Sequence, residues 1–529
     1  MASVRWLDLV VIVLYMGVVA YIGWRCSRKQ TSTENYFVAK RSVPHWAMAF
    51  SFFATLISSI TFIGYPGASY EGNWNKLVPG FMVIGVLALI GMVVIPFFRH
   101  VVGMSAYEYF GKRFGYGARA YSALGFSIGH FSKMGFVFYL LALTINSMTG
   151  WNLLAVIVIA GLVTIFYTLL GGLEAVVWTE VLQGIVMWCG IAVCLIFLFV
   201  LTPGGPAAAF RLAAEHHKFS LGTTDFDFAK KGVWVMLLYG FFWNFQKYTG
   251  DQTIVQRYLM ARSDRDALKG VAVGALMCLP VWTLFMLIGT LVWSYYQLSG
   301  EALPDFIDKA DKVFPHFLIT KIPVGLAGLF MASLFAAGMS TLASDLNCLS
   351  AVGVEDYYRK LRPGATDRQR LAVGKWIVAL CGLAAVAIAI VIALAGEQVL
   401  GLYFTVSSIL TGGIAGMFIL AFLSRRANKG GVWTGIIACL LFTGWATFTS
   451  GNEPLINLGK HNYVWQGVMI GVIGHVVLLV VGWLASFFFP KPDAAMRELT
   501  LWGWLQREKT IASDNMSAPG SQSPNAGGS

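Results

Sequence analysis

The feature that most constrains this chain is a succession of long apolar runs separated by short links that are charged or contain Pro and Gly. A membrane-spanning helix needs about 20 apolar residues. Only 12% of the 529 residues are charged, about half the share of a soluble domain, while the apolar content is far above that of a disordered chain. We therefore predict one large all-α membrane unit and exclude a soluble enzyme. The thirteen predicted spans cover residues 6–24, 45–70, 77–98, 120–148, 153–170, 175–201, 233–250, 271–296, 322–354, 371–395, 399–423, 431–448 and 464–489.

The distribution of basic residues predicts the orientation. Every second loop, the first of which is residues 25–42, lies on one side of the predicted membrane. These loops and the C-terminal tail hold 26 of the 38 Lys and Arg, whereas the loops of the opposite side hold ten. Loops on the cytoplasmic side of a membrane are enriched in Lys and Arg. We expect a multi-pass protein of the cell membrane with its N-terminus outside and its C-terminus in the cytoplasm. Since the positive charge is spread over these loops, it gives no support to nucleic-acid binding.

The span count predicts an internal repeat. One set of five spans precedes a polar loop, and a second set of five follows it. Because five is odd, the second set starts from the opposite side of the membrane, as in inverted-repeat transporters. The predicted parts are an N-terminal extra helix and cytoplasmic loop (1–42), inverted repeat 1 (43–201), an extracellular loop (202–232), inverted repeat 2 (233–424), two C-terminal helices (425–490) and a cytoplasmic tail, predicted to be disordered (491–529).

The first span of each set carries residues that can interrupt a helix. These are Gly64-Tyr65-Pro66-Gly67 in one and Gly240 with the stretch 249–253 in the other. Broken helices expose backbone carbonyls near the midplane, where a cation and a solute can bind. Gly and Pro are also common in ordinary membrane helices, so both interpretations stay open.

The ninth span has one small, hydroxylated face. Ala337, Ser340, Thr341 and Ser344 follow the spacing i, i+3, i+4 and i+7 and share one side of a helix. Such a face can serve close helix packing. It can also bind a hard cation, which prefers oxygen ligands, with carbonyls from residues 54–59 of the second span completing the site.

The sequence resembles the sodium/solute symporter family, which includes sodium/sugar, sodium/sialic acid and sodium/proline carriers. The resemblance covers about residues 5–490. It implies a leucine-transporter-like 5+5 inverted-repeat core with one extra N-terminal and two extra C-terminal helices. It depends on Asn35-Tyr36-Phe37, Ser58-Ser59-Ile60-Thr61-Phe62, Gly171-Gly172-Leu173, Trp178-Thr179-Glu180, Asp251-Gln252, Gln256-Arg257-Tyr258 and the face of the ninth span.

The resemblance also implies the ion sites. The principal sodium ion would be bound by carbonyls and hydroxyls of Ala54, Ile57, Ala337, Ser340 and Thr341. Some relatives have a second sodium site with an Asp and two further hydroxyls. Here Glu180 stands in place of the Asp, Ala343 replaces one hydroxyl and Ser344 remains, so the second set is incomplete.

Polar or aromatic residues that we expect near the midplane are candidates for solute binding. Lys133 stands where the sialic acid branch has an arginine, and a buried cation needs an anionic partner. A solute carboxylate can be that partner, but snorkelling or pairing with a protein carboxylate is an equal alternative. His130 receives no role. The candidates are Ser58, Thr61, Lys133, Asn244, Asp251, Phe404 and Ser408.

These features predict a secondary symporter, with sodium as the required ion and a small polar solute, leaning towards sialic acid or another sugar-like or carboxylate solute. A neutral sugar or monocarboxylate is the alternative within the class. Positions that align with the sugar carriers' pocket Gln and Glu are Thr61 and Gly80, which weakens a sugar assignment.

The chain has no GxxxxGK[ST] loop for ATP and neither HExxH nor GxSxG, which disfavours a membrane enzyme. A channel would need a continuous selective lining. The expected partners are the small polar solute and membrane lipid, with neither nucleic acid nor ATP, and we expect the chain to act as a monomer.

Overall fold

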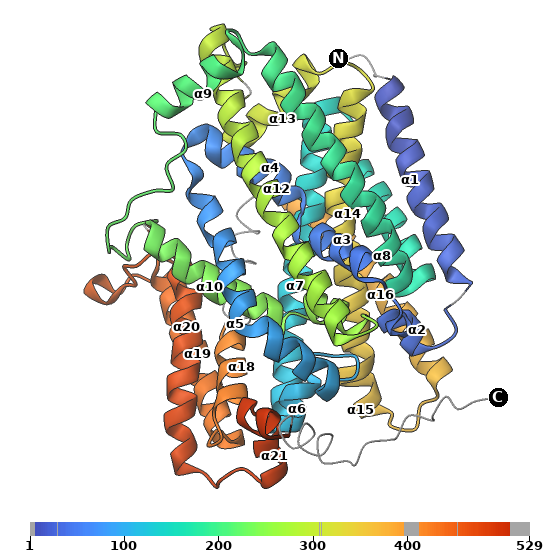
Figure 1. The fold of residues 1–529 in the computed structure, drawn as a ribbon, viewed down its shortest axis with the longest axis vertical. Coiled ribbons are helices and arrows are strands. Elements are labelled where there is room, and N and C mark those ends of the chain that lie inside the picture. The colour runs from blue at the N-terminus through green and yellow to red at the C-terminus, as the bar shows by residue number, and fades with distance from the viewer. Residues whose placement is uncertain are drawn as a thin grey trace, which may run out of the picture.

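The computed structural model describes residues 6–28, 30–305, 307, 309–395, 412–451 and 453–507. Every regular element in these ranges is helical, and most long helices run along the vertical axis of Figure 1. Nine of the described helices are long and apolar enough to cross a membrane, and a bent pair adds a tenth candidate. The elements are α1 (Trp6–Ser27), α2 (Thr33–Val38), α3 (His45–Leu56), α4 (Ser59–Glu71), α5 (Val78–Val101), α6 (Glu108–Phe114), α7 (Tyr116–Thr149), α8 (Leu153–Leu201), α9 (Gly205–Glu215), α10 (Val233–Gly250), α11 (Gln252–Leu259), α12 (Asp264–Ser299), α13 (Ala310–Lys321), α14 (Leu326–Val352), α15 (Arg359–Leu361), α16 (Asp367–Ala395), α18 (Ile414–Leu423), α19 (Lys429–Thr449), α20 (Val468–Ala485) and α21 (Ala494–Glu498).

The predicted spans correspond to these helices with two differences. The fifth and sixth spans together form the 49-residue α8, whose halves meet at a non-helical Gly172. Of the eleventh span only α18 is described, because residues 396–411 lie outside the described part. The count of thirteen therefore stays a prediction.

Both helices predicted to be broken are broken. The break in the first lies at Ile57 and Ser58, where α3 and α4 meet at 58°. The prediction that Gly64–Gly67 interrupts this span was wrong, since α4 continues through Pro66. In the second, α10 ends at Gly250 and α11 begins at Gln252, so the break is Asp251, whose extended backbone (φ −99°, ψ 117°) ends one helix and caps the next.

Helix α14 lies at the centre of the bundle. Apart from Leu326 and Leu329, all its residues are buried, and it contacts α8, α7, α1, α16 and α3. Small residues permit this packing: a Cβ on Gly190 of α8 would lie 2.3 Å from the Ser333 hydroxyl. The flanks are α1 on one side and the α19–α20 pair on the other (Figure 1).

Short helices cover the two ends of the bundle. Helices α9 and α13 lie at the end of the bundle where α1 begins, called here the upper face, and α6, α15 and α21 lie at the lower face (Figure 1). The prediction of a disordered tail was wrong for its first part. Helix α21 is followed by residues that bind the lower face, where Trp502 Nε1 donates to the Leu423 carbonyl (2.7 Å) and Tyr109 donates to the Leu499 carbonyl (3.0 Å).

Gly172 divides α8 and has a backbone that only glycine adopts readily. Its φ is 56° and its ψ is −153°, a region restricted almost entirely to glycine. A Cβ here would also lie 2.6 Å from the Tyr36 ring and 2.8 Å from the Tyr36 carbonyl oxygen. The Tyr36 hydroxyl in turn binds the Thr168 and Leu169 carbonyls just before the break.

We predict that Gly172→Ala destabilises the protein by about 2 kcal/mol or more, since backbone strain of this kind costs ~1–3 kcal/mol before any clash. The measurement is thermal unfolding of the purified protein in detergent. Gly471→Ala in α20 is the matched control, because a Cβ at Gly471 meets nothing within 4 Å and Ala favours helix. Equal melting temperatures for the two variants would contradict the prediction.

Candidate functional site

The first helix break points its carbonyls at α14. The Ser58 amide donates to Thr61 Oγ1 (3.4 Å), and the Thr61 amide donates to the Ser58 carbonyl (2.9 Å). Neither amide therefore donates to the carbonyls of Ala54 and Ile57. Carbonyls at the C-terminus of a helix usually lack a donor from their own helix. Ser340 Oγ lies 2.8 Å from the Ala54 oxygen, and Thr341 Oγ1 lies 3.4 Å from the Ile57 oxygen.

The fifth predicted oxygen belongs to the same cluster. The Ala337 carbonyl lies 3.1 Å from Ser340 Oγ and 3.2 Å from Thr341 Oγ1. All five residues of the predicted sodium set are thus together, and all are completely buried. The hydroxylated face of α14 points at the broken helix and away from the lipid-facing surface. Its five oxygens are of the type that hard cations prefer.

Glu180 and Ser344 also lie together, but beside a cation of the protein itself. Arg257 Nη2 of α11 lies 2.6 Å from Glu180 Oε1 and 2.5 Å from Ser344 Oγ. The Glu180 carboxylate also accepts from Thr55 (3.0 Å) and Ser51. Arg257 and Glu180 are 0% exposed, so the acid's charge is balanced without a bound ion.

The candidate solute residues fall into different environments. Ser58 precedes the first residue of α4, and Thr61 supports that helix end. Asn244 donates to the Pro79 carbonyl (3.0 Å) and the Gly240 carbonyl (2.8 Å). It therefore ties α10 to α5, where Gly240 and Pro79 touch. Phe404 and Ser408 lie outside the described residues.

Lys133 and Asp251 belong to a chain of charged groups that crosses the bundle. Lys133 Nζ lies 3.1 Å from Asp345 on α14. His130, one turn before Lys133, places Nδ1 2.8 Å from Asp345 Oδ1 and Nε2 3.3 Å from Asp251 Oδ2. Lys247 Nζ completes the chain at 2.5 Å from Asp251. In the structure the partner of Lys133 is a protein carboxylate, one of the alternatives left open above.

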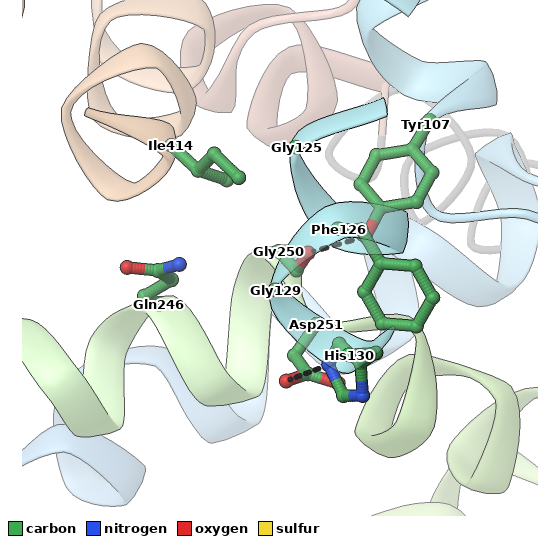
Figure 2. Close-up of a pocket in the computed structure, with 9 residues that line it drawn as sticks. All are labelled: Tyr107, Gly125, Phe126, Gly129, His130, Gln246, Gly250, Asp251 and Ile414. Carbon is green, nitrogen blue, oxygen red and sulfur yellow. Dashed lines mark hydrogen bonds and ion pairs between the residues drawn. The ribbon is translucent and has the colours of Figure 1, made fainter. Parts of the chain in front are cut away.

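A pocket of about 190 Å³ adjoins this network, and Figure 2 shows its lining. The rings of Tyr107 and Phe126 lie on one side, and Gln246 and Ile414 on the other. The Tyr107 hydroxyl donates to the Gly250 carbonyl (3.1 Å), next to the break at Asp251. The second break is therefore bridged by Tyr107, which precedes α6, and by His130 of α7, as the first is bridged from α14.

Sequence reasoning missed three members of this network, His130, Lys247 and Asp345. One signal could have found them: ionisable residues inside membrane helices are rare and mark functional positions by default. Asp345 directly follows the hydroxylated face of α14, and His130 and Lys133 lie on adjacent turns of α7.

Comparison with known proteins identifies the family of the chain. The model of the sodium:solute symporter family matches residues 36–439. The sodium/sialic acid symporter NanT of Aliivibrio fischeri is 29% identical over 91% of this chain and 93% of its own length. The sodium/sialic acid symporter SiaT of Proteus mirabilis is 29% identical over 90% and 94%.

A solved structure has the same fold. A Na⁺-coupled sialic acid symporter in a substrate-bound, outward-open state, described as having a novel Na⁺ site, superimposes with a TM-score of 0.85. It is 28% identical, and the match covers 92% of this chain and 99% of that one. Since the family model covers most of the chain, the protein belongs to the sodium:solute symporter family.

Proposed function

We propose that this protein couples the inward movement of sodium to the import of a small acidic, sugar-like solute, with sialic acid as the first candidate. The observation that carries the proposal is the set of five buried oxygens where α14 meets the break between α3 and α4. The relatives that transport sialic acid support the choice of solute.

The sodium ion would be bound by the carbonyls of Ala54, Ile57 and Ala337 and the hydroxyls of Ser340 and Thr341. Neutral oxygens suit a monovalent ion that must be released on the other side. We assign no second sodium ion to Glu180 and Ser344, because Arg257 occupies that position. At about 100 mV one inward charge supplies ~2.3 kcal/mol, and a tenfold sodium gradient adds ~1.4 kcal/mol. Together they support an accumulation of a few hundred-fold without ATP.

The solute would bind near Ser58, Thr61 and Lys133, between the first break and the charged network, with Phe404 and Ser408 as further candidates. Asn244 is excluded, since its amide holds two helices together. By the charge distribution, the upper face would be outside the cell and both solute and sodium would leave at the lower face. The chain would act as a monomer in lipid.

Uptake by the purified full chain in proteoliposomes tests this proposal. We expect saturable uptake of labelled sialic acid that requires inward-directed sodium and rises with an inside-negative potential. A channel would equilibrate the solute without a gradient, and an enzyme would transform it. Sodium-dependent uptake of glucose or lactate instead of sialic acid would replace the solute by the neutral sugar or the monocarboxylate and leave the mechanism in place.

We predict that Lys133→Ala impairs uptake of an acidic solute at least tenfold more than uptake of a neutral one. The substitution removes a cation and also leaves the Asp345 carboxylate without its ammonium partner, so that it repels an anion. The measurement is the uptake rate of sialic acid and of its methyl ester by the two proteins. Equal losses for both would contradict an acidic solute.

A further inference from the structure

Asp345 presents a carboxylate to Lys133 in the position that an acidic solute would take. The Lys133 ammonium lies 3.1 Å from Asp345 Oδ1 and also 3.1 Å from Oδ2. The Asp345 side chain is 0% exposed, whereas 29% of the Lys133 side chain remains exposed. Lys133 is therefore less enclosed than Asp345, and the counter-ion of its ammonium is already supplied by the protein.

The other lysine of the network also has a carboxylate partner. Lys247 pairs with Asp251 (2.5 Å), and the two ring nitrogens of His130 lie 2.8 Å from Asp345 Oδ1 and 3.3 Å from Asp251 Oδ2. Two lysines thus face two aspartates. A solute carboxylate that approaches this network meets two ammonium groups that are each already paired with a carboxylate, unless it takes the place of Asp345 on Lys133.

Asp345 is also placed to connect this exchange with the ion site. It follows Thr341 by four residues on α14, so the two share a helix face at a separation of about 6 Å along the axis. His130 Nδ1 lies 2.8 Å from Asp345 Oδ1 and remains as a hydrogen-bond partner for the carboxylate when Lys133 is taken by another anion.

We propose that Asp345 is a specificity-determining residue, a resident carboxylate that competes with the acidic group of the solute for Lys133 and lowers the preference for acids over neutral solutes. This inference uses the solute site of the proposed function but goes beyond it, because it predicts the ratio between acid and neutral binding and not the identity of the solute.

Three acid and neutral pairs test the inference on the full chain in sodium buffer: sialic acid and its methyl ester, glucuronate and glucose, and lactate and lactamide. The readout is the dissociation constant from thermal-shift titration. For Asp345→Asn we expect the preference for the acid to rise at least tenfold in at least one pair. Asp345→Glu should keep the ratio of the unmodified protein. Glu301→Gln, which changes an acid paired with Lys321 at the upper face, is the matched control and should also keep it.

A second variant decides the question even where Asp345→Asn, which leaves Lys133 unpaired, does not fold. Lys133→Gln with Asp345→Asn removes both charges together. Since Lys133 is already neutralised in the unmodified protein, the double variant should keep the acid-to-neutral ratio within about threefold. A tenfold loss of acid preference in the double variant means that Lys133 was free for the solute and overturns the inference.

The two proposals can fail separately. If the unmodified chain takes up sialic acid with sodium but Asp345→Asn leaves every ratio unchanged, only the inference is wrong. If the unmodified chain does not take up sialic acid but Asp345→Asn binds glucuronate or lactate in preference to its neutral partner, only the solute assignment is wrong. A folded Asp345→Asn variant that binds no acid in any pair also overturns the inference, because a freed Lys133 should hold at least one.

Discussion

Ser340→Ala combined with Thr341→Ala is expected to abolish sodium-dependent uptake. The double variant removes two of the five oxygens that we assign to the ion, and the three remaining carbonyls cannot replace the hydration shell of a cation in a dry site. The measurement is the initial rate of solute uptake into proteoliposomes as a function of external sodium. At a sodium concentration that saturates the parent protein, we expect the uptake rate of the double variant to be at least a hundredfold lower than that of the parent.

Ser333→Ala is the matched control on the same helix. Its hydroxyl also points to backbone carbonyls, those of Val186 and Leu329 at 2.8 Å, but it lies two turns from Ser340. This variant should keep the sodium dependence. Normal sodium-driven uptake by the Ser340 and Thr341 double variant would falsify the assignment of the ion site, whatever the effect of the control.

Arg257→Met is expected to cause the largest loss of stability in the molecule. The guanidinium is completely buried and donates to Glu180, Ser344, Ser51 and the Thr253 carbonyl. Removing one partner of a buried ion pair costs about 3–5 kcal/mol, because the other charge is left without compensation. The measurement is the melting temperature and the folded yield of the purified protein. Glu180→Gln should show a loss of the same order.

The double variant Arg257→Met with Glu180→Met separates the charge from the packing. Replacing both members of a buried pair by apolar residues is often close to neutral, so the double variant should recover most of the stability that either single variant loses. A double variant as unstable as the sum of the two single ones would show that hydrogen bonding to Ser51 and Ser344, and not the charge pair, holds α11 in place.

Much of the fold could be predicted because the hydrophobic pattern is so regular. Apolar runs of membrane length leave few options for the backbone, and an odd number of spans in each half leads directly to an inverted repeat. The position of a break within a helix is harder to predict. Pro66 and its two glycines lie inside a continuous α4, whereas Ile57 and Ser58, which carry no helix-breaking signature, separate the two helices because α14 and Thr61 supply partners for the freed backbone groups.

The same limit applies to the candidate sites. The hydroxylated face of α14 follows from helical spacing alone, and the five oxygens of the sodium set are together. Charged groups could not be paired in this way, because a partner such as Asp345 for Lys133 lies 212 positions away in the chain and depends on how α7 and α14 cross. Arg257 likewise belongs to a recognisable motif, but its position between Glu180 and Ser344 is a property of the packed bundle.

The crossing of the two halves has a consequence for leakage. Helix α14, the third long helix of the second half, faces the break at Ile57 and Ser58, and α7, the third long helix of the first half, faces the break at Asp251 through His130. Each half of the fold therefore contacts the helix break of the other half. A movement that separated one break from its partner helix while the other contact stayed in place would strain both halves of the bundle. The architecture therefore disfavours intermediate conformations in which an ion could cross without the solute.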